Sequence, residues 1–99
     1  MQRYIFFISY DKFVANFLFR VHHLYHVKKA YDIEIKKLGK RIKKLRELKG
    51  VTQQDLSDLC EVDIRTIQRI EKGEFGSGLH IVYAIADAFK ISIAELFNT

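Results

Sequence analysis

The 99-residue chain contains no proline, no tryptophan and only one cysteine, and these absences exclude several classes of protein. Without proline it has no proline-rich linker, and no repeat or low-complexity segment is present. A single cysteine cannot form an internal disulfide, which excludes a disulfide-stapled secreted domain and favours the reducing cytoplasm. Cys60 lies on an apolar stripe, where a thiol serves as a small core residue rather than as a nucleophile. No run approaches the roughly 18 apolar residues of a membrane-spanning helix, so we expect no span.

The residue sets that carry catalysis are also lacking. The sequence has no glycine-rich phosphate loop, no combination of nucleophile and base, and no metal-ligand cluster. His22, His23 and His26 lie close together, and the first and last are four residues apart, as two ligands on one helix face would be. No cysteine or carboxylate lies near them to complete a set of three or four ligands. We therefore expect no enzyme, no metal and no cofactor.

Charge and apolar content describe what the chain does have. Basic residues outnumber acidic ones by 17 to 12, which gives a net charge of +5. This balance permits binding to nucleic acid or to an anionic surface without identifying either. Apolar residues make up 48% of the sequence, enough for a modest core in one domain that carries an appendage.

Residues 53–73 form the most informative stretch and predict two short helices joined by a tight turn. Thr52 and Asp55 have the spacing of a reciprocal capping box at the start of the first helix. Asp63 is placed to cap the second helix, and Gly73 follows its last periodic residue, where a left-handed residue ends a helix best. The predicted apolar stripes are Leu56, Leu59 and Cys60 in the first helix and Ile67 and Ile70 in the second.

The second of these helices, over about residues 63–72, has a solvent face with positive and amide side chains and no carboxylate. A face of this kind, presented by a two-helix unit, is what reading the DNA major groove requires. Its members are Ile64, Arg65, Gln68, Arg69 and Lys72.

Helices are also predicted on both sides of this unit. Asp32 is placed to cap a helix over about 33–49, which Gly50 ends. Two more are expected at about 79–89 and 93–97, the last with Ser92 and Glu95 as a capping box. The predicted inward residues are Ile35, Leu38, Ile42, Leu45 and Leu48 or Lys49 in the first, Leu79, Val82, Ile85, Ala86 and Phe89 in the second, and Ile93, Leu96 and Phe97 in the third.

Three segments, LGKRIKKLRELKGVTQQDL, IRTIQRIEKGE and IADAFKISIAELF, together resemble the Cro/phage-repressor type of helix-turn-helix domain, often called the XRE family, over about residues 35–97. The resemblance implies an all-α, five-helix, lambda-repressor-like domain that binds double-stranded DNA as a sequence-specific, repressor-like transcriptional regulator. We further expect a homodimer on a two-fold-related operator. The chain departs from the family at Glu61, where a glycine is usual and a left-handed residue costs a non-glycine about 1 kcal/mol.

The resemblance also implies residue roles. It implies that Arg46 and Glu71 form a structural pair that ties two helices together. The lysine-rich outer face of the helix over 33–49 is either a solvated face or a phosphate-facing flank. The opposing alternative for the whole domain is an antitoxin-like or adaptor module that has kept the fold without binding DNA. The expected base readers are Ile64, Arg65, Gln68 and Arg69, and the expected phosphate contacts are Gln53, Lys72, Lys40, Lys43 and Lys44.

Residues 1–31 are expected to be an aromatic-rich appendage to a DNA-binding domain at 32–99. The run RYIFFISY predicts a short strand, and residues 11–30 predict a helix with too much apolar surface to stand alone in water. Four explanations stay open: packing on the domain, a dimer interface, upstream sequence included by a wrong start, and, more weakly, a peripheral membrane contact flanked by lysines.

Overall fold

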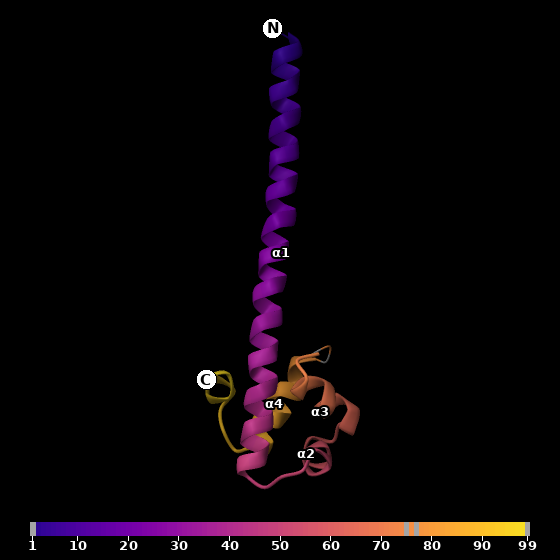
Figure 1. Ribbon diagram of the computed structural model, residues 1–99, viewed down its shortest axis with the longest axis vertical. Coiled ribbons are helices and arrows are strands. Elements are labelled where there is room, and N and C mark those ends of the chain that lie inside the picture. The colour runs from indigo at the N-terminus through magenta and orange to yellow at the C-terminus, as the bar shows by residue number, and fades with distance from the viewer. Residues whose placement is uncertain (1, 75, 77, 99) are drawn as a thin grey trace. The chain divides into compact units, whose positions relative to one another are not determined.

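The computed structural model describes the backbone of residues 2–74, 76 and 78–98, and side chains from residue 12 onward within those ranges. The chain divides into two compact units, Met1–Tyr31 and Asp32–Thr99. The described residues form five α-helices and no strand, so the all-α, five-helix class is confirmed (Figure 1). The helices are α1 (Gln2–Leu48), α2 (Gln53–Cys60), α3 (Ile64–Glu71), α4 (Leu79–Ala88) and α5 (Ile93–Phe97).

The N-terminal segment differs from the expectation. Helix α1 includes both the stretch predicted as a strand and the position at Asp32 that was predicted to begin a new helix. No glycine or proline interrupts the chain before Gly39, so nothing in the local sequence ends the helix. A lone strand would also leave its backbone groups unpaired, whereas a helix pairs them within the segment. The predictions of a strand at 3–10 and of a cap at Asp32 were therefore wrong.

In the first unit, the large apolar side chains from residue 12 onward are exposed to solvent. Phe13 is 71% exposed, Leu24 67% and Tyr31 49%. Among residues 12–31 no side chain is buried, so the described part of this unit has no core of its own. The other large apolar residues exposed there are Phe17, Leu18, Phe19, Val21, Tyr25 and Val27.

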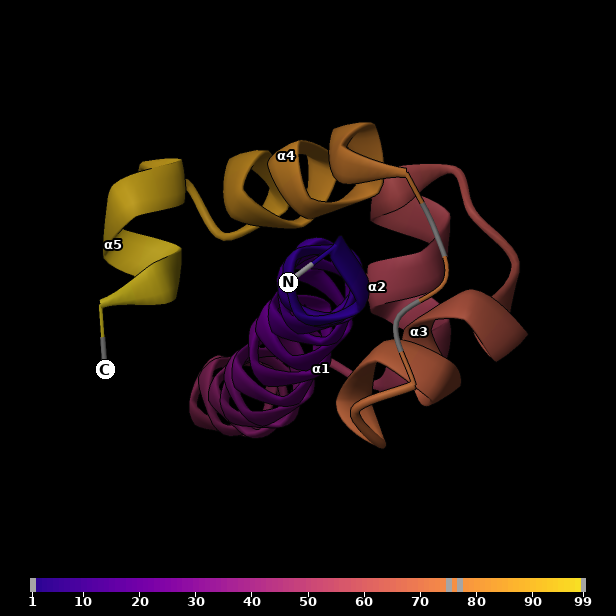
Figure 2. The same ribbon diagram turned by 90° about the horizontal axis from the view of Figure 1, so that it is seen from above.

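The second unit has one apolar core to which every helix contributes. Seen from above, α2, α3, α4 and α5 lie around the C-terminal part of α1 (Figure 2). Burial raises the pKa of the Cys60 thiol, with the nearby charge of Asp87 adding to the effect, as fits an unreactive core cysteine. The buried apolar side chains are Ile35, Leu38, Ile42, Leu56, Cys60, Ile67, Ile70, Val82, Ile85, Ala86, Phe89 and Leu96.

Some predicted inward residues lie outside this core. Leu59 is exposed, whereas Ser57 is buried. The side of α2 that packs against α3 and α4 carries residues 56, 57 and 60. The Ser57 hydroxyl donates to the carbonyl of Gln54 at 2.8 Å, so its burial leaves no unpaired donor. Leu48, Leu79 and Phe97 are also exposed.

The predicted caps and turns are present around α2 and α3. The Thr52 hydroxyl accepts from the N–H of Asp55, and the Asp55 carboxylate accepts from the N–H of Thr52, both at 3.0 Å. The Asp63 carboxylate accepts from the N–H of Arg65. Glu61 is left-handed at φ 55° and ψ 42°, as the departure from glycine implied. At the start of α5, Ser92 accepts from Glu95, which supplies one half of the predicted capping box.

Gly39 allows α1 and α3 to approach each other closely. A Cβ atom at this position would lie 2.2 Å from the carbonyl oxygen of Ile70 and 3.1 Å from that of Glu71. Both obstacles are backbone atoms, which cannot turn aside as a flexible side chain can. The contact therefore depends on the absence of a side chain at residue 39 and fixes the distance between the two helices.

Candidate nucleic-acid interface

Helix α3 divides into a buried face and an exposed face. Ile67 and Ile70 are almost completely buried, while Arg65, Gln68 and Arg69 are exposed on the other side. Ile64, the remaining expected base reader, is half-buried at the start of the helix. Arg65 and Arg69 are four residues apart, so they lie about one turn from each other on the same face. The structure thus brings together on one face the side chains that were expected to read bases.

The guanidinium groups of Arg65 and Arg69 form no ion pair with other described residues. The one carboxylate within α3, that of Glu71, is instead directed to Arg46. An arginine whose donors are open to solvent can place its planar fork on the two major-groove acceptors of guanine. The exposed face of α3 therefore keeps the chemistry that base reading needs.

The ion pair expected between Arg46 and Glu71 is present and joins α1 to α3. Arg46 donates from Nε to Glu71 Oε2 at 2.7 Å and from Nη2 to Oε1 at 3.1 Å. Its Nη1 also donates to the carbonyl of Val51 at 3.0 Å, which holds the segment before α2. The two side chains are only 12% and 4% exposed, and the hydrogen bond to Glu71 raises the pKa of Arg46. The pair is thus a charged, almost buried clamp behind the exposed face.

Gln53 is attached to the same clamp, a contact that sequence reasoning missed. Its Nε2 donates to Glu71 Oε1 at 3.1 Å, across 18 residues of sequence. Nothing in the local pattern signals this bond, because it depends on how α2 packs against α3. Gln53 also opens α2, where the first N–H groups lack intrahelical acceptors and the positive end of the helix dipole favours an anion. Glu71 therefore holds the residue of α2 that was expected to contact a DNA phosphate.

Three of the expected phosphate contacts and one expected base reader line a common hollow with Glu71. We call this hollow of about 310 Å³ the α3 hollow; its lining residues are Lys43, Gln53, Gln68, Glu71 and Lys72. It joins the start of α2, the exposed face of α3 and one edge of α1. Apart from Glu71, whose charge is compensated by Arg46, its side chains are cations and amides. This surface suits a phosphate chain beside a helix that reads bases.

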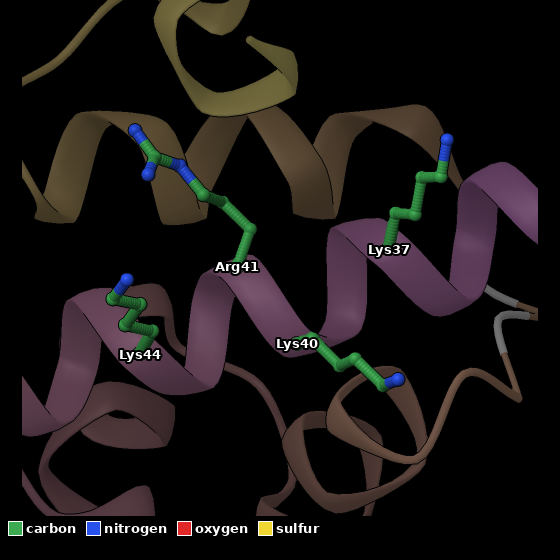
Figure 3. A pocket seen from close by; sticks show the side chains of 4 residues that line it. All are labelled: Lys37, Lys40, Arg41 and Lys44. Carbon is green, nitrogen blue, oxygen red and sulfur yellow. The ribbon is translucent and has the colours of Figure 1, made fainter. Parts of the chain in front are cut away.

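The other two lysines expected to contact phosphate lie elsewhere on α1. Lys40 and Lys44 line a second hollow with Lys37 and Arg41, which we call the α1 hollow (Figure 3). The basic residues of α1, which lie close together in the sequence, are therefore divided by the helix between two surfaces.

The comparison with protein families decides what this arrangement is. A family model described as "Helix-turn-helix" matches residues 42–96, which is more than half of the chain. The chain belongs to the helix-turn-helix family. This membership confirms the resemblance to the Cro/phage-repressor type of domain. The helix-turn-helix protein is therefore a DNA-binding transcriptional regulator, and its family is one of regulators rather than of enzymes.

Curated relatives of this helix-turn-helix protein match about six-tenths of its length. An uncharacterized HTH-type transcriptional regulator of Archaeoglobus fulgidus is 37% identical over 57 residues, which cover 58% of this chain and 81% of the relative. The competence pilus inhibition repressor of Acinetobacter baylyi is 32% identical over 60 residues, which cover 61% of this chain and 54% of the relative.

Solved structures show the same architecture. The restriction-modification controller protein C.AhdI from Aeromonas hydrophila superposes with a TM-score of 0.62 at 30% identity, covering 65% of this chain and 97% of that one. The clp gene regulator ClgR from Corynebacterium glutamicum shares the fold, with a TM-score of 0.60 at 22% identity, covering 64% of this chain and 67% of that one.

The three histidines of the first unit, His22, His23 and His26, are exposed on α1. The Nε2 atoms of His22 and His26 lie 2.9 Å apart on exposed side chains. No group of three or more potential ligands that could hold a metal ion is found among the described residues. None of the helices there combines the length and hydropathy needed to cross a membrane.

Proposed function

We propose that this protein is a sequence-specific, repressor-like regulator of the cytoplasm that places α3 in the major groove of an operator. The observation that carries the proposal is the division of α3, with Ile67 and Ile70 in the core and Arg65, Gln68 and Arg69 turned outward together. An antitoxin-like or adaptor module on the same fold would not need two arginines beside an exposed amide.

Arg65 and Arg69 are the proposed guanine readers, each discriminating by about 1–3 kcal/mol against a wrong base. Ile64 is placed to meet a thymine methyl group, and Gln68 can donate to and accept from an adenine edge. Gln53, Lys43 and Lys72, which line the α3 hollow, are the proposed phosphate contacts. Lys40 and Lys44, also expected to contact phosphate, line the α1 hollow instead and are considered below.

We further propose a homodimer on a two-fold-related site, because one recognition helix reads only a few base pairs. The first unit supplies a surface for pairing. Phe13, Phe17, Arg20, Leu24, Val27 and Tyr31 follow each other at alternating steps of four and three residues. This is the spacing of a coiled-coil seam, and its apolar members are exposed. Pairing of two copies along the seam would remove those side chains from water.

Selection of binding sites from a random pool of duplexes tests the reading face. The wild-type protein should enrich one short motif, and Arg69→Ala should lose enrichment at some of its positions while keeping affinity for random duplex. Lys49→Ala, which removes an exposed charge from the end of α1, serves as the control and should select the wild-type motif. Failure of the wild-type protein to enrich any motif would favour the adaptor alternative.

A further inference from the structure

Every described residue that lines the α1 hollow carries a positive charge. It has a volume of about 380 Å³, and its lining residues are Lys37, Lys40, Arg41 and Lys44. All four side chains leave one stretch of α1, and those of Lys37 and Arg41 extend to the same side of the helix in Figure 3. Their spacing of three, one and three residues is what brings them to one surface of a helix.

This hollow faces away from α3. Gly39 marks the side of α1 that meets α3, through its contact with the backbone of Ile70. At about 100° per residue, Lys37 and Arg41 lie about 160° around the helix from Gly39, whereas Lys43 lies only about 40° away. A ligand in the α1 hollow would therefore be bound apart from the surface proposed to read DNA.

Without a ligand, the arrangement is electrostatically unfavourable. Like charges three and four residues apart on a helix repel each other, and the α1 hollow contains two such pairs at each spacing. Glu34 reaches Lys37 at 3.6 Å, but both side chains are largely exposed, so water screens this pair. In addition, Arg41 Nε is buried without an acceptor among the described residues. A buried donor of this kind needs an acceptor from outside the protein, such as water or a bound anion.

We propose that the α1 hollow binds a phosphate-bearing anion. Arg41 supplies a planar fork that matches two phosphate oxygens, and the three lysines supply mobile point charges around it. The volume lies at the lower end of the range for small-molecule sites, which accommodates a phosphate group with a small attached moiety. The same chemistry has two sources: a free phosphorylated compound, or the backbone of a DNA duplex that passes this face of α1.

Thermal melting of the full chain with pyrophosphate tests for the site. Pyrophosphate should raise the Tm of the wild-type protein, since a ligand that binds only the folded state stabilises it. Lys37→Gln/Arg41→Gln should reduce this shift to roughly half or less. Lys28→Gln/Lys29→Gln removes the same charge from the first unit and should keep the wild-type shift. Equal shifts in the two double variants, or no shift in the wild-type protein, would overturn the proposal.

If the Arg41 substitution weakens folding, Lys37→Gln alone makes the same comparison, because the Lys37 side chain is largely exposed. A salt titration of binding to random duplex then separates the two sources. A slope for Lys37→Gln/Arg41→Gln that is shallower by about one to two units assigns the hollow to the DNA backbone. An unchanged slope, together with the reduced pyrophosphate shift, assigns it to a free phosphorylated compound. Neither result depends on whether Arg69 reads bases.

Discussion

The Glu71 carboxylate receives two donors from Arg46, at 2.7 and 3.1 Å, and a third from Gln53 at 3.1 Å. One side chain of α3 thereby holds α1 on one side and the first residue of α2 on the other. The negative charge of Glu71 would repel DNA, but Arg46 neutralises it. The same ion pair holds α3 in position against α1. The proposed base-reading helix and the proposed phosphate contact Gln53 are consequently linked through Glu71.

Removal of one partner of the Arg46–Glu71 pair should destabilise the protein more than removal of both. Arg46→Ala or Glu71→Ala alone leaves an almost buried charge unpaired, which costs about 3 kcal/mol or more. The double variant should lose clearly less than the sum of the two single losses. Denaturant unfolding of the four proteins gives the coupling energy, and a coupling near zero would show that the pair does not join the helices.

Gly39→Ala should lower stability by about 1–3 kcal/mol, because the new Cβ would meet the backbone oxygen of Ile70 in a packed contact. In a helix without such a contact the same change would be stabilising. Gly76→Ala is the matched control, since a Cβ there meets nothing within 4 Å. Comparison of the Tm values tests the close approach of α1 to α3, and a Gly39→Ala protein at least as stable as the wild type would contradict it.

Glu61→Gly should raise stability by about 1 kcal/mol, because Glu61 is left-handed at φ 55° and glycine adopts this conformation without the steric cost. Glu61→Ala keeps the strain and removes only the exposed carboxylate, so it should melt close to the wild type. Thermal unfolding of the three proteins measures the difference. Equal Tm values for the glycine and alanine variants would mean that the turn carries no strain.

Acid stability should depend in part on Asp55. The hydrogen bond from the backbone N–H of Thr52 lowers the pKa of Asp55, and the Thr52 side chain adds to the effect. Because the folded-state pKa lies below the unfolded value of about 3.9, this contribution is present above that pH and is lost as pH falls further. Between pH 5 and pH 3 the wild-type Tm should fall more than that of Asp55→Asn. Equal decreases in the Tm of the two proteins would show that groups other than Asp55 cause the acid sensitivity.

Substitution within the proposed seam of the first unit should weaken the dimer. Phe17→Ser removes an apolar member of the four–three repeat, whereas Phe19→Ser removes a phenylalanine of similar exposure that lies off the repeat. Sedimentation of the full chain should show a shift toward monomer for the first variant and little change for the second. An equal effect of the two changes would indicate that the first unit does not pair along this seam.

Lys72→Ala should weaken binding to the selected operator and to random duplex by similar factors. A phosphate contact carries no base information, so its loss lowers general affinity and makes the salt slope shallower by about one unit. Arg69→Ala should instead affect mainly the selected operator. Salt titrations with both duplexes separate the two roles, and equal losses for Arg69→Ala on both would make Arg69 a backbone contact.

Several features followed from the amino-acid sequence by itself because they depend on residues within a turn of one another. The caps at Thr52 and Asp63 and the stripe of Ile67 and Ile70 each involve local hydrogen bonds or a single helical period. The left-handed residue at Glu61 was instead implied by the family resemblance. The outward face of α3 followed in the same way, since fixing the buried residues of a short helix also fixes the exposed ones. The family motifs supplied the Arg46–Glu71 pair.

Only the tertiary structure decided the contacts that depend on how one helix packs against another. Ser57 and Leu59 are two residues apart on α2. The positions of α3 and α4 determine that the serine is buried and the leucine is exposed. Gln53 meets Glu71 across 18 residues because α2 and α3 pack together. The lysines of α1 form one run in the sequence, yet the contact at Gly39 turns Lys43 toward α3 and leaves Lys40 and Lys44 with Arg41 in another hollow. Such relationships depend on the orientation of whole helices, which local periodicity does not specify.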